Sequence, residues 1–185
     1  MLNKSPKDII IDGSLSIAQS MGWQFITLQD IAKESGVSLS DIREHFDDKN
    51  DIVTAYWRRL DQKMLSSVSE PDLSVSTKDR LFEIFMERFD LLSDDREAMV
   101  SILSSFKSDP KQIVMSSPNV CKSMNWILEA IGEDSNGLQG MAKIMGLTAL
   151  YIKVLRDWTN DDTEDLSKTM ASLDSALSHY ENAGS

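Results

Sequence analysis

The 185-residue sequence is short of the residues that interrupt helices and of those that cross-link a chain. It contains 8 Gly, 4 Pro and one cysteine, Cys121. A single cysteine excludes an intramolecular disulfide and fits a reducing, cytoplasmic setting. Because Gly and Pro are few and apolar residues recur every three or four positions, the sequence predicts an all-α fold.

Basic residues are scarce as well. The chain has 19 Lys and Arg but 30 Asp and Glu, which gives a formal net charge of −11. So acidic a chain has no general attraction to nucleic acid or anionic lipid, and any such contact must be local. Long hydrophobic runs are also missing. The longest, residues 144–152, is about half the length of a membrane span, so we expect no transmembrane helix and no signal peptide.

The sequence lacks the residue patterns from which common catalytic sites are built. Its two histidines, His45 and His179, are far apart, and with one cysteine they form no metal-ligand pattern. It has no glycine-rich phosphate loop and no nucleophile elbow. Cys121 lies on an apolar helix face, which is typical of a small core residue. We therefore predict no enzyme, no catalytic residue, no metal site and no cofactor.

Hydrophobic periodicity and helix caps predict eight to ten helices in two domains. Residues 66–76 carry Pro71 and five serines without a helical period, and they form the best boundary in the chain. We predict a helix-turn-helix domain at residues 1–50, a connecting helix at 51–70 and a helical domain at 71–185. The expected helices lie near residues 6–20, 28–35, 39–46, 49–64, 77–92, 95–106, 110–132 with a break near Pro118, 137–158 and 163–180.

Two short predicted helices that meet at Gly36 carry the most informative pattern. Thr27 and Ser38 each stand three residues before a carboxylate, Asp30 and Asp41, which predicts a capping box at each helix start. Gly36 can adopt the left-handed conformation that ends the first of these helices. The arrangement is typical of a helix-turn-helix.

Residues 27–38, TLQDIAKESGVS, followed by His45-Phe46 and Lys49, resemble the DNA-binding region of the TetR family of transcriptional repressors. The resemblance covers about residues 9–60. It implies a three-helix DNA-binding domain, a connecting helix and a larger helical bundle that dimerises through its last two helices and often holds an apolar effector. The implied function is a one-component transcriptional regulator, a repressor, that binds palindromic operator DNA as a homodimer and responds to a small apolar effector.

Residue by residue, the resemblance implies DNA contacts from Thr27, Ser38, Leu39, Ser40, Arg43, His45 and Lys49. Two features depart from the family pattern. Arg43 stands where a tyrosine is usual, and residues 38–51 hold five acidic against two basic side chains, a local charge of −3. Such a surface should bind phosphate weakly and with a shallow salt dependence. The alternative interpretation is a packed three-helix unit that has lost DNA binding.

Methionine and aromatic side chains recur at helical spacing in the second domain. Residues of this kind line adaptable apolar cavities, and they also build ordinary cores. The predicted ligand pocket consists of Phe85, Phe89, Met99, Leu103, Phe106, Met124, Trp126, Met141 and Met145.

The last predicted helix has apolar residues at a spacing of 4, 3, 4 and 3 between Leu166 and Tyr180, which predicts a seam for a partner helix. Small residues on the preceding helix would allow a close approach, so we predict a four-helix dimer interface. Its predicted residues are Gly146, Tyr151, Met170, Leu173 and Leu177. The alternative is that this face packs within the chain.

A second resemblance covers about fifty residues of the C-terminal half. This region is similar to the coenzyme Q biosynthesis accessory family, lipid-binding proteins with the same repressor-like fold. The residues that carry it are Trp126, Gly132-Glu133, Leu150-Tyr151, Trp158, Asp161-Asp162 and 170–174. The aromatic and basic cluster that this family carries after its Gly-Asp is absent here, where residues 135–139 read SNGLQ. The resemblance implies an alternative function, the binding of an isoprenoid lipid or quinone intermediate without a DNA role.

Overall fold

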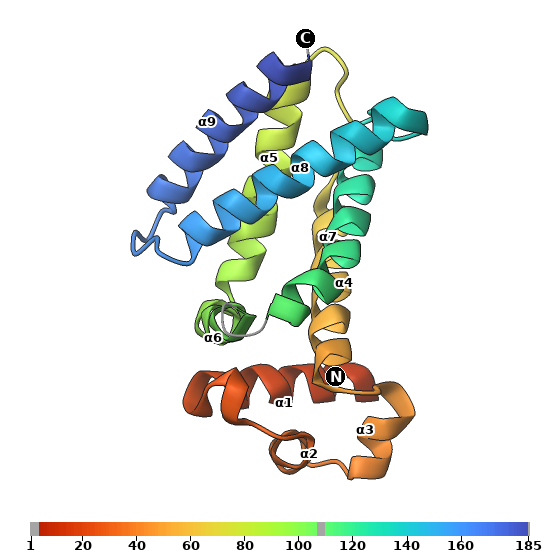
Figure 1. Cartoon of the computed structure of the whole chain (residues 1–185), viewed down its shortest axis with the longest axis vertical. Helices are drawn as coiled ribbons and strands as arrows, with labels where there is room; N and C mark the ends of the chain where they lie inside the picture. The colour runs from red at the N-terminus through yellow and green to blue at the C-terminus, as the bar shows by residue number, and fades with distance from the viewer. Residues whose placement is uncertain (1–3, 107–109, 185) are drawn as a thin grey trace. The chain divides into compact units, whose positions relative to one another are not determined.

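The computed structural model describes residues 4–106 and 110–184, and within these ranges the chain forms helices and no strand (Figure 1). The predicted all-α fold class is confirmed. The elements are α1 (Pro6–Met21), the short 3-10 helix η1 (Trp23–Phe25), α2 (Leu28–Ser35), α3 (Leu39–His45), α4 (Lys49–Ser67), α5 (Thr77–Ser93), α6 (Arg96–Phe106), α7 (Pro110–Ala130), α8 (Gly137–Trp158) and α9 (Ser167–Gly184).

The helices group into two compact units, and each unit is made of two separate segments. The N-terminal unit comprises Met1–Leu60 with Leu92–Ser117, and the C-terminal unit comprises Asp61–Leu91 with Pro118–Ser185. This division differs from the contiguous boundaries expected from sequence. The reason is that α6 packs on α1 and η1, where the Ser101 hydroxyl accepts a hydrogen bond from the amide of Trp23 at 2.9 Å.

Side-chain caps start the helices of the N-terminal unit where the sequence predicts them. The Ser5 side chain caps α1. In α2, Thr27 and Asp30 bond reciprocally to each other's backbone amides, and Ser38 and Asp41 repeat this arrangement in α3. Because each box satisfies two amides that have no partner inside the helix, helices as short as these can begin at a defined residue.

The turn between α2 and α3 depends on a left-handed residue. Gly36 has φ 67° and ψ 28°, and its amide donates to carbonyls in the last turn of α2. Ile31 and Ile42 are buried on the two helices that this turn joins. The predicted helix-turn-helix is therefore present, with Gly36 as the residue that ends α2.

Close contact between α1 and α2 depends on Gly13. A Cβ atom at this position would lie 2.1 Å from Oγ of Ser35 and 3.0 Å from its Cβ. The first half of α4 is joined to α1 by ion pairs, since Arg59 contacts Asp12 at 2.7 Å and Asp8 at 3.4 Å. The N-terminal unit is thus held by tight packing on one side of α1 and by charge pairing on another.

In the C-terminal unit, α8 and α9 lie side by side (Figure 1). Gly146 permits this approach, because a Cβ there would lie 2.8 Å from the ring of Tyr180. Helix α9 begins at Ser167 and not at residue 163, which corrects the predicted start. Leu166, buried with φ 54°, breaks the helical path before Ser167.

The carboxylate of Asp161 organises the connection between α8 and α9. It is buried, and it accepts hydrogen bonds from the amide and hydroxyl of Thr163 at 3.1 and 2.5 Å and from those of Thr169 at 2.7 Å each. Burial alone raises the pKa of a carboxyl group, but these four bonds hold the pKa of Asp161 well below its usual range. Asp161 is therefore ionised inside the fold at neutral pH.

Two further expectations concern single helices. Helix α7 continues from Pro110 through Pro118, so the predicted break near Pro118 is wrong. Helix α8 is long and apolar enough to cross a membrane by length and composition, a weak indication, because the core helix of a soluble protein passes the same test. One face of α8 is buried inside the C-terminal unit.

We predict that Gly13→Ala destabilises the protein by about 1–3 kcal/mol, although alanine favours a helix by about 1 kcal/mol. The reason is the clash with Ser35, which has to push α1 away from α2. Urea unfolding measures the change. Gln19→Ala on the exposed side of α1 is the control, and Ser35→Gly should restore much of the stability of Gly13→Ala. An unchanged midpoint for Gly13→Ala would contradict the tight packing.

We predict that Asp161→Asn lowers the free energy of unfolding by about 2 kcal/mol at pH 7. The amide oxygen of Asn cannot accept all four bonds, and its NH2 group would point at the donors of Thr163 or Thr169. Since the folded pKa is depressed, the contribution of Asp161 is complete above its unfolded pKa of about 3.9 and is lost as the pH falls below it. The gap between wild type and variant should therefore narrow in acid. Asp162→Asn, next to it and exposed, should show a small effect at pH 7.

Candidate nucleic-acid interface and ligand-binding region

Helix α3 presents a mostly polar and acidic surface. Ser40, Arg43 and Glu44 are exposed, and Leu39 keeps about half of its surface, 48%, in contact with solvent. Arg43 forms an ion pair with Asp47, which lies just beyond the end of α3, so its charge is partly neutralised. The outward surface of α3 therefore offers one cation that is already shared with a carboxylate.

Several of the acidic groups near α3 serve as helix caps. The hydroxyl of Thr27 donates to Asp30 at 2.6 Å and that of Ser38 donates to Asp41 at 2.7 Å. The Thr27 side-chain and backbone bonds lower the pKa of Asp30, and the Ser38 backbone and side-chain bonds lower the pKa of Asp41. Part of the local negative charge is thus structural, because ionised carboxylates hold the helix starts.

Lys49 at the start of α4 is turned toward the interior of the N-terminal unit. Its Nζ donates to the carbonyls of Trp23 at 3.1 Å and Ile26 at 2.6 Å, and it lies 5.1 Å from the centre of the Trp23 ring. Burial lowers its pKa, an effect that Asp30 partly opposes. His45 is half-buried with its ring edge-on to Phe46. Both residues pack the end of the helix-turn-helix in this structure.

The nine residues of the predicted ligand pocket fall into three groups. Three are buried in the C-terminal unit: Phe85, Phe89 and Met124. Three lie on α6 in the N-terminal unit: Met99, Leu103 and Phe106. Three have exposed side chains on α7 and α8: Trp126, Met141 and Met145. Helical spacing alone does not tell which face of each helix is covered, so it did not separate the buried residues of this set from the exposed ones.

The residues of the predicted dimer interface are mostly covered within the chain. Tyr151, Leu173 and Leu177 are buried, and Gly146 faces the ring of Tyr180. Met170 is exposed. The seam of α9 therefore packs against α8 of the same chain in the structure.

A buried polar network crosses the core of the C-terminal unit. Arg88 is almost completely buried and forms an ion pair with Asp61, while its Nε donates to the Tyr151 hydroxyl at 3.1 Å. Ser123 donates to the other Asp61 oxygen at 2.6 Å. Burial opposes the charge on Arg88, but Tyr151 and Asp61 raise its pKa, and burial raises the pKa of Tyr151. A charged guanidinium and a neutral phenol thus join four helices, α4, α5, α7 and α8.

Phe85 and Phe89 stack on the Tyr151 ring with centroid distances of 5.9 and 5.7 Å, and Phe89 also stacks on Trp158 at 6.5 Å. Arg88 was not identified from the sequence as a buried residue, although its position in α5 could have indicated this. Arg88 interrupts the apolar period of α5, whose buried members include Ile84, Phe85, Phe89 and Leu92. A charged residue at a core position of a helix is a sign of a buried partner.

Two open grooves lie on the C-terminal unit. The first, of about 330 Å³, is lined by residues 67–72 and 75, by α5 and by the end of α7. The second, of about 610 Å³, lies among the start of α5, α8 and α9. None of the nine predicted pocket residues lines either groove.

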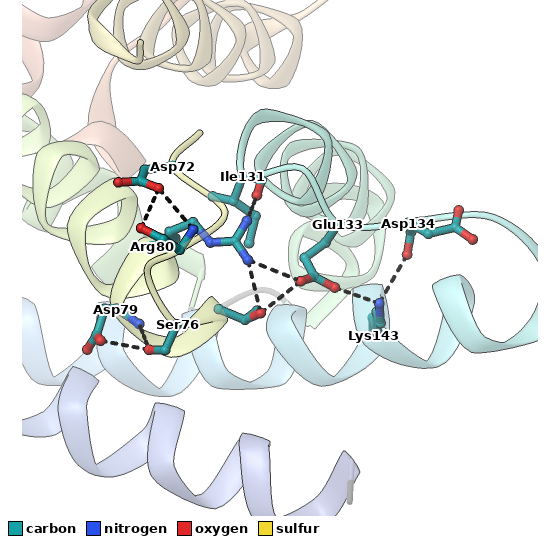
Figure 2. A network of polar contacts seen from close by, with 10 residues as sticks. Asp72, Ser76, Asp79, Arg80, Ile131, Glu133, Asp134 and Lys143 are labelled. Carbon is teal, nitrogen blue, oxygen red and sulfur yellow. Dashed lines mark hydrogen bonds and ion pairs between the residues drawn. The ribbon is translucent and has the colours of Figure 1, made fainter. Parts of the chain in front are cut away.

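Figure 2 shows the polar contacts near these grooves. Arg80 donates to the carbonyl of Ile131 and, at 3.2 Å, to Thr77, and it lies 3.5 Å from Glu133. Lys143 forms an ion pair with Glu133 at 2.9 Å. The Lys143 hydrogen bond lowers the pKa of Glu133, so this carboxylate is ionised and bridges α5 to α8.

Comparison with known proteins supports both resemblances. The COQ9 family model matches residues 113–184. The HTH-type transcriptional regulator BetI of Cronobacter sakazakii is 30% identical over 106 residues, which are 56% of this chain and 52% of that protein, so the chain spans about half the length of this curated relative.

Two solved structures have the same architecture along nearly the whole chain. A TetR transcriptional regulator from Nitrosomonas europaea superimposes with a TM-score of 0.77 at 23% identity, over 96% of this chain and 99% of that one. A TetR regulator from Rhodococcus sp. RHA1 gives a TM-score of 0.67 at 13% identity, over 95% and 94%. The chain therefore has the fold of the TetR-type transcriptional regulators, with a helix-turn-helix followed by a helical bundle.

Proposed function

We propose that the protein is a TetR-type transcriptional regulator that binds operator DNA through α2 and α3. The observation that carries this proposal is the helix-turn-helix itself, with two capping boxes and a left-handed Gly36 between them. The likeness to BetI, named as an HTH-type regulator, adds support. In this proposal the protein works in the cytoplasm and is not an enzyme.

The proposed DNA contacts keep the residues that the sequence indicates. Ser40, Arg43 and Leu39 of α3 reach the major groove, and the helix starts at Thr27 and Ser38 offer amides to backbone phosphates. Their exposure on α3 and at the two caps supports these roles. In the same proposal Lys49 exchanges a carbonyl for a phosphate when DNA binds, and His45 stays packed at the end of α3.

We propose a homodimer, as in the repressor-like fold, with an interface shifted from the one expected from sequence. Helix α8 carries exposed apolar side chains at positions 138, 141, 145 and 152, which lie on one face because the spacing is 3, 4 and 7. Exposed Met170 lies on the neighbouring α9. Two such faces packed together give a four-helix interface and two reading heads for a palindromic operator.

The proposed small apolar effector binds the C-terminal unit and changes the spacing of the two reading heads. Its proposed contacts include the pocket residues Phe85, Phe89 and Met124, which are buried there. The COQ9 match over residues 113–184 favours a second function, binding of an isoprenoid lipid or quinone intermediate without DNA. Failure to bind DNA together with lipid seen by native mass spectrometry would support that alternative.

We predict that the protein retards DNA from upstream of its own gene in low salt, and more weakly at physiological salt. Arg43→Ala should weaken binding about tenfold or more, because it removes the exposed cation of α3. Glu44→Gln should strengthen binding, because it removes a negative charge from the same surface.

Arg58→Ala on α4 and Glu164→Gln before α9 are the matched controls, since both side chains are exposed and lie outside the helix-turn-helix. Gel retardation or fluorescence anisotropy measures the affinities. No binding of the wild-type protein in either salt would reject the proposed function.

We predict that Met145→Glu converts the dimer to a monomer, because two carboxylates would face each other in an apolar interface. Light scattering coupled to gel filtration measures the mass. Met21→Glu, at an exposed methionine of α1, should leave the dimer intact. A wild-type monomer at micromolar concentration, or a dimer that survives Met145→Glu, would contradict the proposed surface.

A further inference from the structure

The smaller groove of the C-terminal unit combines an apolar interior with an acidic lining. It lies beside the segment that joins α4 to α5, and Figure 2 shows part of its wall, where Asp72, Arg80 and Ile131 come together. Its volume of about 330 Å³ suits a small molecule. The apolar residues that line it are Val68, Pro71, Val75, Ile84, Ala130 and Ile131.

Four carboxylates line the same groove: Glu70, Asp72, Glu83 and Glu87. Glu83 and Glu87 lie one turn apart on α5, on the side that faces the groove. In the described part of the chain neither forms an ion pair within 4.0 Å, and neither does Glu70. Like charges one helical turn apart destabilise a helix, so this arrangement costs the fold energy until a cation joins it.

Arg80 offsets only part of the charge of this lining, since its guanidinium acts on Asp72. Its guanidinium is engaged by the Ile131 carbonyl, by Thr77 and by Glu133, which does not line the groove. Asp72 is ionised, since the side-chain and backbone bonds of Ser74 lower its pKa. The four acidic residues and Arg80 together give the groove lining a formal charge of −3.

We propose that this groove binds an organic cation. The molecule would have about ten heavy atoms in all and would consist of an ammonium group and an apolar chain. The ammonium would lie against Glu83 and Glu87, and the apolar part would cover Ile84 and Val75. A metal ion fits less well, because the described residues contain no group of three or more His, Cys, Asp or Glu arranged to hold one.

The lining of the larger groove does not favour a ligand of one charge. Its lysines are already paired, Lys78 with Asp174 at 2.7 Å and Lys143 with Glu133 at 2.9 Å, and Glu181 lies on its rim. Charges of both signs therefore line it, and no ligand charge is favoured. In the acidic groove, a cavity, apolar wall residues and carboxylates without an ion pair coincide.

As a binding site the acidic groove is independent of DNA. The apolar effector of the proposed function has other contacts, since Phe85, Phe89 and Met124 do not line this groove. The organic cation is therefore a second ligand, bound where α4 leads into α5.

Isothermal titration of the full chain with hexyltrimethylammonium, in low salt and without DNA, tests the site. We expect saturable binding that weakens as sodium chloride is added, and no binding of octanoate, an anion of similar length. The double variant Glu83→Gln/Glu87→Gln should weaken binding about tenfold or more while keeping the thermal midpoint within a few degrees. The matched control Glu97→Gln/Glu164→Gln, at exposed glutamates outside the groove, should bind as the wild type does.

Three results would overturn the proposal: no saturable binding of hexyltrimethylammonium, equal binding of octanoate, or an affinity that the Glu83→Gln/Glu87→Gln change leaves intact. None of these depends on DNA. If the protein binds the cation but retards no DNA, the proposed site stands and the proposed regulator function is rejected. If it binds DNA but no cation, only the proposed site is rejected.

Discussion

The C-terminal unit depends on one buried ion pair, that between Asp61 and Arg88. Arg88 is buried with its guanidinium 5.0 Å from the centre of the Tyr151 ring, and a guanidinium in such surroundings is tolerated only when its donors are bonded. Loss of one partner from such a pair costs about 3–5 kcal/mol. Because Asp61 also accepts from Ser123 and Arg88 also donates to Tyr151, the network joins residues of four helices, α4, α5, α7 and α8.

The position of Asp61 gives this pair its importance for function. Helix α4 starts at Lys49 in the N-terminal unit, and Asp61 is the residue at which it enters the C-terminal unit. A ligand that moves α5 or α8 must act on the atoms that hold Asp61. The acidic groove is lined by α5 at Ile84, one turn before Arg88, and at Glu87, next to Arg88. In our proposal, a ligand in this groove acts on α5 close to the ion pair that holds Asp61.

Local features were predictable from the sequence, and choices between helix faces were not. The capping boxes at Thr27 and Ser38 and the left-handed Gly36 were predicted correctly, because each depends on residues within three or four positions. The burial of Leu173 and Leu177 inside the chain was not, since an apolar seam looks the same whether a neighbouring helix or a second copy covers it. The ion pair of Arg88 joins residues 27 positions apart, a distance that periodicity does not report.

The negative charge of the chain has three different physical origins. Asp30 and Asp41 are ionised because they cap helices, and Asp161 because four donors surround it. Their charge is the result of local bonding and carries no information about a partner. Glu83 and Glu87 have no such bonds, and neither does Glu44 on the outer face of α3. Charges that the fold does not use are the ones a partner meets, so we expect an acidic α3 to lower affinity for DNA and propose that the acidic groove binds a cation.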